Sequence, residues 1–218
     1  MAIIHRPHAG LRLNRRHFVA GGLASLGAAA APALGQGRAP TAESPMGPFY
    51  PVVRPADSDY DLTRLPWRAE RAAGTVIEVS GRVTDMRGNP VPGAQIELWQ
   101  ANAAGRYDHP SDVSTAPLDP NFQGFATIAA DRAGDWRIVT VKPGGYDSPI
   151  GRRPPHIQFV MTGNAHRNVA QLYFPEETDG NAADTLYRAL GDGAGSSLAT
   201  RDPADPNKYR WDVVMMEG

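Results

Sequence analysis

The sequence contains no cysteine among its 218 residues. This absence excludes disulfide bonds, catalysis by a thiol and zinc sites built from thiolates, so a core, a bound metal or an oligomer interface has to hold the fold together. The sequence also lacks the G-x-S-x-G pattern of a nucleophile elbow and the glycine patterns of a P-loop or a dinucleotide-binding turn. The enzyme classes that depend on those patterns are therefore not indicated.

Long hydrophobic runs are also scarce. The apolar run at residues 19–35 is rich in Ala and Gly, and it is too short and too rich in Gly to indicate a membrane span. It follows Arg15 and Arg16 and ends in small residues, an order that is typical of a twin-arginine export signal. A disordered N-terminus that contains an Arg-Arg pair is the alternative. We expect residues 1–35 to be removed and the mature protein to be periplasmic, with no membrane segment.

Positive charge is in deficit once this signal is removed. The signal holds four of the 22 basic residues and no acidic one, which leaves 18 basic against 23 acidic residues and a net charge of −5. A mildly acidic domain has no basic surface for nucleic acid or for an anionic membrane. The 183 residues that follow position 35 are enough to bury a sizeable core.

Short alternating segments separated by turns dominate from Thr75 onward. Residues 36–74 are instead rich in Pro, Gly, Asp and Arg without any period, and they are expected to form an extended arm. Such short strands between Gly and Pro turns predict an all-β fold, a β-sandwich of short antiparallel strands over residues 75–218. The expected strands are 75–85, 94–100, 124–131, 136–141, 155–162, 169–174 and 209–215, with one short helix at 181–190.

Histidines are few: only His109, His156 and His166 follow the signal. Tyr107 lies in the loop after the second expected strand, Tyr146 lies in a turn after the fourth, and His156 opens the next strand. Binding and catalytic sites are usually built from loops at one end of a β scaffold, which favours these two tyrosines and His156 as a group. A single tyrosine would be an ordinary rim residue, and His109 and His166 are interpreted as exposed loop histidines.

This run of segments resembles the intradiol ring-cleavage dioxygenases, and in particular the branch similar to protocatechuate 3,4-dioxygenase. The resemblance implies a β-sandwich enzyme that uses O₂ to cleave a catechol-type ring between its two hydroxyl-bearing carbons. It also implies assembly through the arm into a homo- or hetero-oligomer, with residues 47–51 (GPFYP) as a candidate contact. The matching stretches keep the family's order: 93–102 (GAQIELWQAN), 105–107 (GRY), 117–122 (PLDPNF), 141–146 (VKPGGY), 153–157 (RPPHI) and 171–174 (QLYF).

The resemblance implies an Fe(III) site held by two tyrosinates and two histidines. By position, Tyr107 and His156 would be equatorial ligands, and Tyr146 would be the axial ligand that the catechol displaces. A trivalent ion prefers anionic oxygen and lowers the pKa of a coordinated phenol, and imidazole also suits iron. The resemblance further places Arg153 beside the reacting ring, where its charge would favour a developing anion, and Gln171 in the wall of the pocket.

Gln158 stands where the family's His-x-His strand has its second histidine. Residues i and i+2 of a strand share a face, so Gln158 would point toward the metal together with His156. Its amide oxygen is neutral and its NH₂ end cannot ligate. Three outcomes stay open: Gln158 or a water completes a working site, iron binds weakly, or the chain is a non-catalytic relative that binds a phenolic molecule or serves as a partner subunit. The substrate also stays open among catechol, hydroxyquinol, protocatechuate and lignin-derived catechols.

Overall fold

The computed structural model describes residues 37–216. The export signal predicted for residues 1–35 lies outside the described residues, so it stays a prediction. The described part of the chain contains eleven β-strands, two short α-helices and one 3₁₀ helix. None of its helices is long and apolar enough to cross a membrane.

The first sheet is built around the long strand β1 (Val76–Asp85). On one edge β1 pairs antiparallel with β4 (Asp135–Val141). On the other edge it pairs parallel with β10 (Lys208–Arg210) and then with β11 (Val213–Met215), and β9 (Thr200–Arg201) extends the sheet beyond β10. The sheet is therefore mixed, because the last strands return parallel to the first one.

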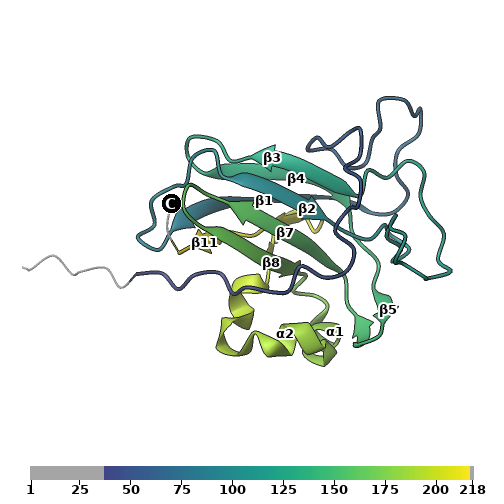
Figure 1. Cartoon of the computed structure of the whole chain (residues 1–218). Coiled ribbons are helices and arrows are strands. Elements are labelled where there is room, and N and C mark those ends of the chain that lie inside the picture. The colour runs from purple at the N-terminus through teal and green to yellow at the C-terminus, as the bar shows by residue number, and fades with distance from the viewer. Residues whose placement is uncertain (1–36, 217–218) are drawn as a thin grey trace, which may run out of the picture. The chain divides into compact units, whose positions relative to one another are not determined.

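The second sheet is wholly antiparallel and has the order β3-β2-β7-β8. The two sheets face each other and form the predicted sandwich (Figure 1). The outer surface of this second sheet carries His156 and Gln158, two of the ligands proposed from the sequence. Its strands are β2 (Gln95–Trp99), β3 (Phe125–Ala129), β7 (His156–Thr162) and β8 (Arg167–Tyr173).

The hydrophobic core lies between the two sheets. Ile77 and Val79 of the first sheet and Leu98, Ile157 and Phe159 of the second belong to one cluster of fully buried side chains. They alternate along their strands with residues that point the other way, as a sandwich with period-2 patterning requires. The prediction of an all-β sandwich is confirmed.

A short hairpin that the sequence did not predict follows β4. It consists of β5 (Tyr146–Ser148) and β6 (Gly151–Arg153), and its turn is closed by a hydrogen bond from Ser148 Oγ to the Gly151 carbonyl at 2.7 Å. The hairpin pairs Tyr146 directly with Arg153. Tyr146 and Arg153, for which the resemblance implied separate roles, are thus held side by side.

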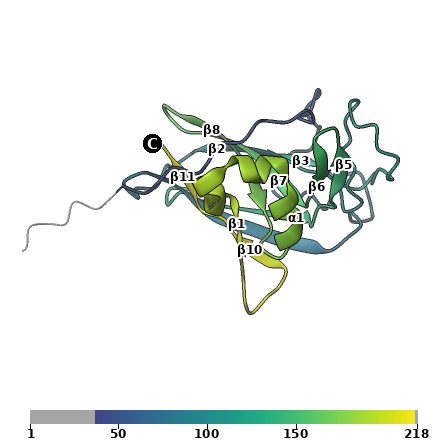
Figure 2. The same cartoon turned by 90° about the horizontal axis from the view of Figure 1, so that it is seen from below.

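The single helix predicted at residues 181–190 is in fact broken in two. α1 (Thr178–Ala183) ends at Asp184, which is extended (φ −68°, ψ 124°), and α2 (Thr185–Ala189) begins immediately after it. A 3₁₀ helix, Gly191–Ser197, completes this helical segment. The segment lies beneath β8, and α1 contacts β6 near the site (Figure 2).

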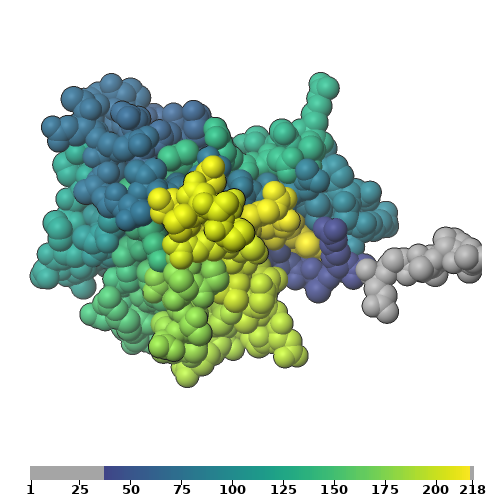
Figure 3. Space-filling model, turned by 180° about the vertical axis from the view of Figure 1, so that it is seen from behind, coloured from purple at the N-terminus to yellow at the C-terminus, as the bar shows by residue number. Residues whose placement is uncertain are grey.

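The arm runs along the outside of the sandwich. Near its start the Thr41 N–H donates to the Val214 carbonyl at 2.9 Å, and from behind the arm (purple) lies against the last strand (yellow) in Figure 3. The Ser44 N–H then donates to the Val169 carbonyl of β8 at 2.8 Å, so the arm crosses the outer side of the second sheet (Figure 1). This course brings residues 45–50 over the outer face of β7 and β8.

Candidate metal centre

The outer face of the second sheet carries the candidate site. The register of β7 and β8 places His156 opposite Tyr173 and Gln158 opposite Gln171. Directly paired residues of antiparallel strands project from the same face, so these four side chains point out of the sandwich together. All four are nonetheless buried, because the arm and the neighbouring loops cover them.

The two tyrosines reach this face from loops at the same end of the sheet. The ring centroids of Tyr107 and Tyr146 are 5.4 Å apart, and those of Tyr146 and His156 are 5.7 Å apart. The two loops pack closely, since a Cβ at Gly105 (φ +79°) would lie 2.4 Å from the Gly145 carbonyl oxygen. The structure therefore brings together the three side chains that the sequence proposed as strong ligands.

Three polar atoms in this cluster are buried and have no hydrogen-bond partner among residues 37–216. They are Tyr107 Oη, His156 Nε2 and Gln158 Oε1. Buried polar atoms almost always have partners, because an unpaired one loses its hydration without compensation. The Nδ1–H of His156 donates to the Pro154 carbonyl at 2.8 Å, which leaves the lone pair on Nε2. A metal ion would satisfy all three atoms at once.

Burial keeps these groups neutral in the metal-free protein. It raises the pKa of the Tyr107 hydroxyl well above its usual value, and it also raises the pKa of Tyr146. Burial, together with the nearby positive charge of Arg153, lowers the pKa of His156 to about 3. A neutral imidazole is the form that binds metals, and a bound cation would reverse the preference of the two phenols by favouring their anions.

Gln158 lies among the proposed ligands. Its side chain is 1% exposed and projects from the same face as His156. The arm passes directly over it, since a Cβ at Gly47 (φ +73°) would lie 3.0 Å from Gln158 Oε1. The amide is therefore confined between the sheet and the arm backbone, and its oxygen has no hydrogen-bond partner within residues 37–216.

Arg153 is held by a network that the sequence only partly predicted. Its Nε–H donates to Asp184 Oδ2 at 2.8 Å, and its Nη2 donates to Gln171 Oε1 at 2.6 Å and to Tyr173 Oη at 3.1 Å. Gln171, which the resemblance places in the wall of the pocket, is buried and accepts from Arg153, and its role at the site stays a prediction. Asp184 and Tyr173 were missed as site residues: Tyr173 shares the strand parity of Gln171, which was a usable signal, whereas nothing in the sequence around Asp184 pointed to Arg153.

Phe49 of the arm covers the two tyrosines. Its ring stacks on Tyr107 with centroids 4.5 Å apart and meets Tyr146 edge-on at 5.8 Å. His109 packs against the same ring at 5.7 Å, and its Nδ1 accepts the Ser111 N–H. Sequence reasoning treated this part of the arm only as a possible subunit contact, because a lid over a site leaves no periodic pattern.

The remaining histidine and the acidic residues do not extend the ligand set. His166 lies at the opposite end of β7 from His156, with Nε2 3.8 Å from Glu43 Oε1. Within the described range, no group of three or more His, Cys, Asp or Glu residues is placed to hold a metal. A metal at the candidate site would therefore depend on the phenol oxygens.

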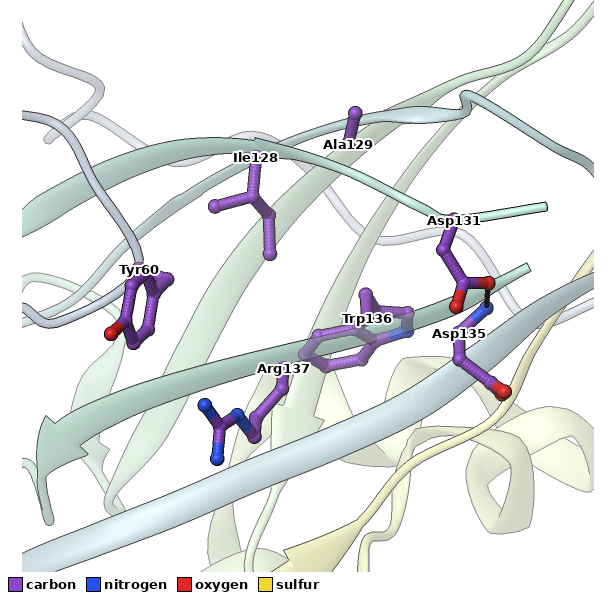
Figure 4. Close-up of a pocket in the computed structure, with 7 residues that line it drawn as sticks. All are labelled: Tyr60, Ile128, Ala129, Asp131, Asp135, Trp136 and Arg137. Atoms are coloured by element: carbon purple, nitrogen blue, oxygen red, sulfur yellow. Dashed lines mark hydrogen bonds between the residues drawn. The ribbon is translucent and has the colours of Figure 1, made fainter. Parts of the chain in front are cut away.

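A separate hollow of about 440 Å³ lies between β3 and β4 (Figure 4). It contains none of the site residues and lies toward the Ala129 end of β3, whereas the tyrosine cluster lies beyond the Phe125 end. Its floor is the indole of Trp136, and Asp135 donates its N–H to Asp131 at its rim. The lining residues are Tyr60, Ile128, Ala129, Asp131, Asp135, Trp136 and Arg137.

Comparison with known proteins identifies the family. The family model described as Dioxygenase matches residues 46–217, a range that includes every proposed site residue. The chain belongs to the intradiol dioxygenase family. The resemblance drawn from the six stretches is confirmed, and membership of a family of ring-cleaving enzymes does not favour a role as a phenolic-binding module.

The proteins similar to this chain include both the α chain and the β chain of protocatechuate 3,4-dioxygenase. The β chain of protocatechuate 3,4-dioxygenase from Burkholderia cepacia is 37% identical over 179 residues, covering 77% of this chain and 76% of that one. The α chain from the same organism is 30% identical over 186 residues, covering 80% and 91%. Among solved structures, an intradiol ring-cleavage dioxygenase from Tetranychus urticae has a TM-score of 0.64 at 20% identity, covering 81% of this chain and 94% of that one. At that identity the likeness shows the shared fold alone.

Proposed function

We propose that this protein is a non-haem Fe(III) dioxygenase that cleaves a catechol-type ring between its two hydroxyl-bearing carbons, using O₂. The observation that carries the proposal is the trio of unpaired buried atoms, Tyr107 Oη, His156 Nε2 and Gln158 Oε1, in a member of the intradiol family. None of these atoms makes a hydrogen bond of normal geometry within residues 37–216, and their chemistry suits a hard trivalent cation.

Tyr107, Tyr146 and His156 would hold the iron, with Gln158 Oε1 as a fourth and weaker donor. Two phenolate oxygens supply the negative charge that stabilises Fe(III), and the imidazole adds a neutral nitrogen ligand. When bound, ferric iron supplies the Lewis-acid chemistry that activates a chelating catechol toward O₂. The Pro154 carbonyl orients His156 for this role by fixing its tautomer.

Tyr146 is the proposed ligand that the substrate would displace most easily. It is 7% exposed, the largest exposed fraction among the four candidate ligands, and it opens the short hairpin β5–β6. A three-residue strand moves at less cost than the seven-residue strand that carries His156. The Tyr146 phenolate oxygen would accept a hydroxyl proton from the entering catechol.

Arg153 would stabilise the charge that develops on the ring as it reacts. Arg153 is 4% exposed and pairs with Tyr146 across the hairpin. A preorganised cation in a site that excludes water stabilises developing negative charge more strongly than the same cation in solution. Gln171 holds that guanidinium in place, and Phe49 keeps water from the phenols.

We also propose that the mature protein is exported through its twin-arginine signal and acts as a homo- or hetero-oligomer. The basic, apolar and small-residue order of residues 1–35 supports export. Two relatives are named as the α and β chains of one enzyme, which supports assembly from more than one chain. Residues 47–51 stay the proposed contact in such an assembly.

Ring cleavage is tested by loading the mature protein with iron and incubating it with catechol, hydroxyquinol or protocatechuate in aerated buffer. We expect O₂ uptake equal to catechol loss, and a ring-opened product with two new carboxylates that together carry both atoms of ¹⁸O₂ by mass spectrometry. His156→Ala is the control and should show neither. Iron-loaded protein that binds these catechols without consuming O₂ would instead support the binding module.

A further inference from the structure

The helical segment places a buried carboxylate against Arg153. Asp184 is 0% exposed, and its Oδ2 accepts the Nε–H of Arg153 at 2.8 Å. Its other oxygen, Oδ1, accepts the backbone N–H groups of Leu186 and Tyr187 at 2.7 and 3.3 Å. A buried carboxylate is tolerated when its oxygens are occupied in this way, so its position and orientation are tightly defined.

The contacts around Arg153 leave one end of its guanidinium without a protein partner. The group has five N–H donors in a rigid plane. Nε faces Asp184, and Nη2 faces Gln171 Oε1 and Tyr173 Oη. Nη1 makes no hydrogen bond with any residue of the described chain, so both of its N–H groups remain available to a ligand.

This guanidinium lies between strands that carry the proposed iron ligands. Arg153 pairs with Tyr146 across the hairpin, and Tyr173 pairs with His156, its ring centroid 5.9 Å from the imidazole. If the guanidinium group turned, its contact with Asp184 and at least one of the contacts of Nη2 would break together. Asp184, which lies at the junction between α1 and α2, thus sets the direction of Nη1.

We propose that Asp184 is a positioning residue for ring cleavage, which fixes Arg153 so that Nη1 faces the substrate. The inference rests on the proposed function and extends it to a residue outside the six matching stretches. Asp184→Asn is the sharpest probe, because its Oδ1 can still accept the N–H groups of α2. Its NH₂ group would then face the Nε–H of Arg153, donor against donor, and the guanidinium would turn.

The first measurement is steady-state turnover of the iron-loaded enzyme, expressed per iron bound. We expect Asp184→Asn to lower kcat by about 10- to 100-fold with little change in KM, since small displacements of a positioned group have effects of this order. In an Arg153→Ala background the same change should have no further effect, because Asp184 acts through Arg153. Asn181→Ala is the matched control: the Asn181 side chain, on α1, donates only to the Phe174 carbonyl, and its backbone bond to the Asp184 N–H is kept in the variant, so the variant should melt earlier with kcat per iron unchanged.

The proposal would be overturned by a kcat for Asp184→Asn within threefold of the parent enzyme. It would also be overturned if Asp184→Asn lowered kcat in the Arg153→Ala background by the same factor as in the parent enzyme.

A second measurement does not depend on activity. In the iron-free ¹⁵N-labelled protein, the buried Arg153 Nε–H should give a slowly exchanging resonance, assigned by its absence from Arg153→Lys. Asp184→Asn should abolish this slow exchange, and persistence of the signal at the same position and rate would overturn the inference. If the parent protein opened no catechol ring, the proposed function would fail on that result, and this resonance would still decide whether Asp184 fixes Arg153.

Discussion

Gln158 is the residue at which this chain departs from the His-x-His strand of its family. Its Oε1 is buried, unpaired within residues 37–216 and directed to the same side as His156. An amide oxygen is a neutral and weak donor, so the proposed iron site would have three strong ligands and a fourth that contributes less. The strength of iron binding would then depend on one side chain that can be exchanged for better and worse donors.

Substitution of Gln158 should change iron affinity in both directions. Gln158→His should retain more iron than the parent chain during dialysis against a chelator, because imidazole is the stronger ligand. Gln158→Leu, which keeps the volume and removes the donor, should retain less. Iron measured by atomic absorption after dialysis checks both variants. Equal retention by the parent chain and Gln158→Leu would remove Gln158 from the ligand set.

His156 should make the stability of the iron-free protein depend on pH. Its pKa is about 3 in the folded chain and near 6.5 in the unfolded chain, so between these values the unfolded state binds the extra proton. The contribution of the neutral imidazole to the free energy of unfolding is complete above pH 6.5 and is lost as the pH falls toward 3. Over this range the free energy of unfolding changes by up to about 1.4 kcal/mol per pH unit.

Urea unfolding of the parent chain and of His156→Gln between about pH 4 and pH 7 measures this slope. The variant should lose the part of the slope that His156 contributes, whereas His109→Gln, which changes a histidine outside the unpaired cluster, should keep it. Identical slopes for the parent chain and His156→Gln would show that the imidazole is not buried in its neutral form.

At the scale of elements, the arm acts as the cover of the site. Phe49 stacks on Tyr107, and the Tyr50 hydroxyl donates to Glu97 Oε2 of β2 at 2.9 Å, which fastens the arm to the sheet beside the site. The Pro45 carbonyl accepts a hydrogen bond from Gln171 Nε2 at 3.2 Å. The arm therefore contributes both packing and hydrogen bonds to the face that carries the ligands.

Loss of the Phe49 ring should weaken the fold and open the site. Phe49→Ala should lower the free energy of unfolding by about 1 to 2 kcal/mol, less than a fully buried side chain of this size contributes, because Phe49 is partly buried. It should also speed the loss of iron to a chelator. Val53→Ala, in an arm residue that is 80% exposed, is the control and should change neither quantity. An unchanged unfolding curve for Phe49→Ala would show that the arm does not rest on Tyr107.

The elements that could be predicted are those with a strong local pattern. The alternation in β1, β2 and β7 is local, so their positions followed from the sequence to within a residue or two. The hairpin β5–β6 was not predicted, because three-residue strands are too short to show a hydrophobic period. The break at Asp184 was missed although its cause is local: Asp184 is the N-cap of α2, and its Oδ1 accepts the backbone N–H groups of Leu186 and Tyr187.

The same division applies to the site. Tyr107, Tyr146 and His156 could be proposed because each stands at a strand end within a stretch that resembles the family, and the structure places them together. Asp184 could not be proposed, since its partner lies 31 residues away in sequence.

At the scale of the whole molecule, the site is formed by convergence of separate parts of the chain. One loop supplies Tyr107, a hairpin supplies Tyr146, the second sheet supplies His156 and Gln158, and the arm closes over them. With no cysteine in the sequence, no disulfide contributes to holding these parts in place. Iron bound to the folded state alone would link them and stabilise the protein by mass action.

We propose that these parts of the chain bind one ferric ion through phenol oxygens. The visible absorption spectrum of the mature protein, purified in air and loaded with iron, tests it most directly. We predict a tyrosinate-to-iron charge-transfer band that gives a red to burgundy colour, and that is shifted and weakened in Tyr107→Phe. Iron-loaded protein that is colourless, or a band that is the same in Tyr107→Phe, would contradict the account.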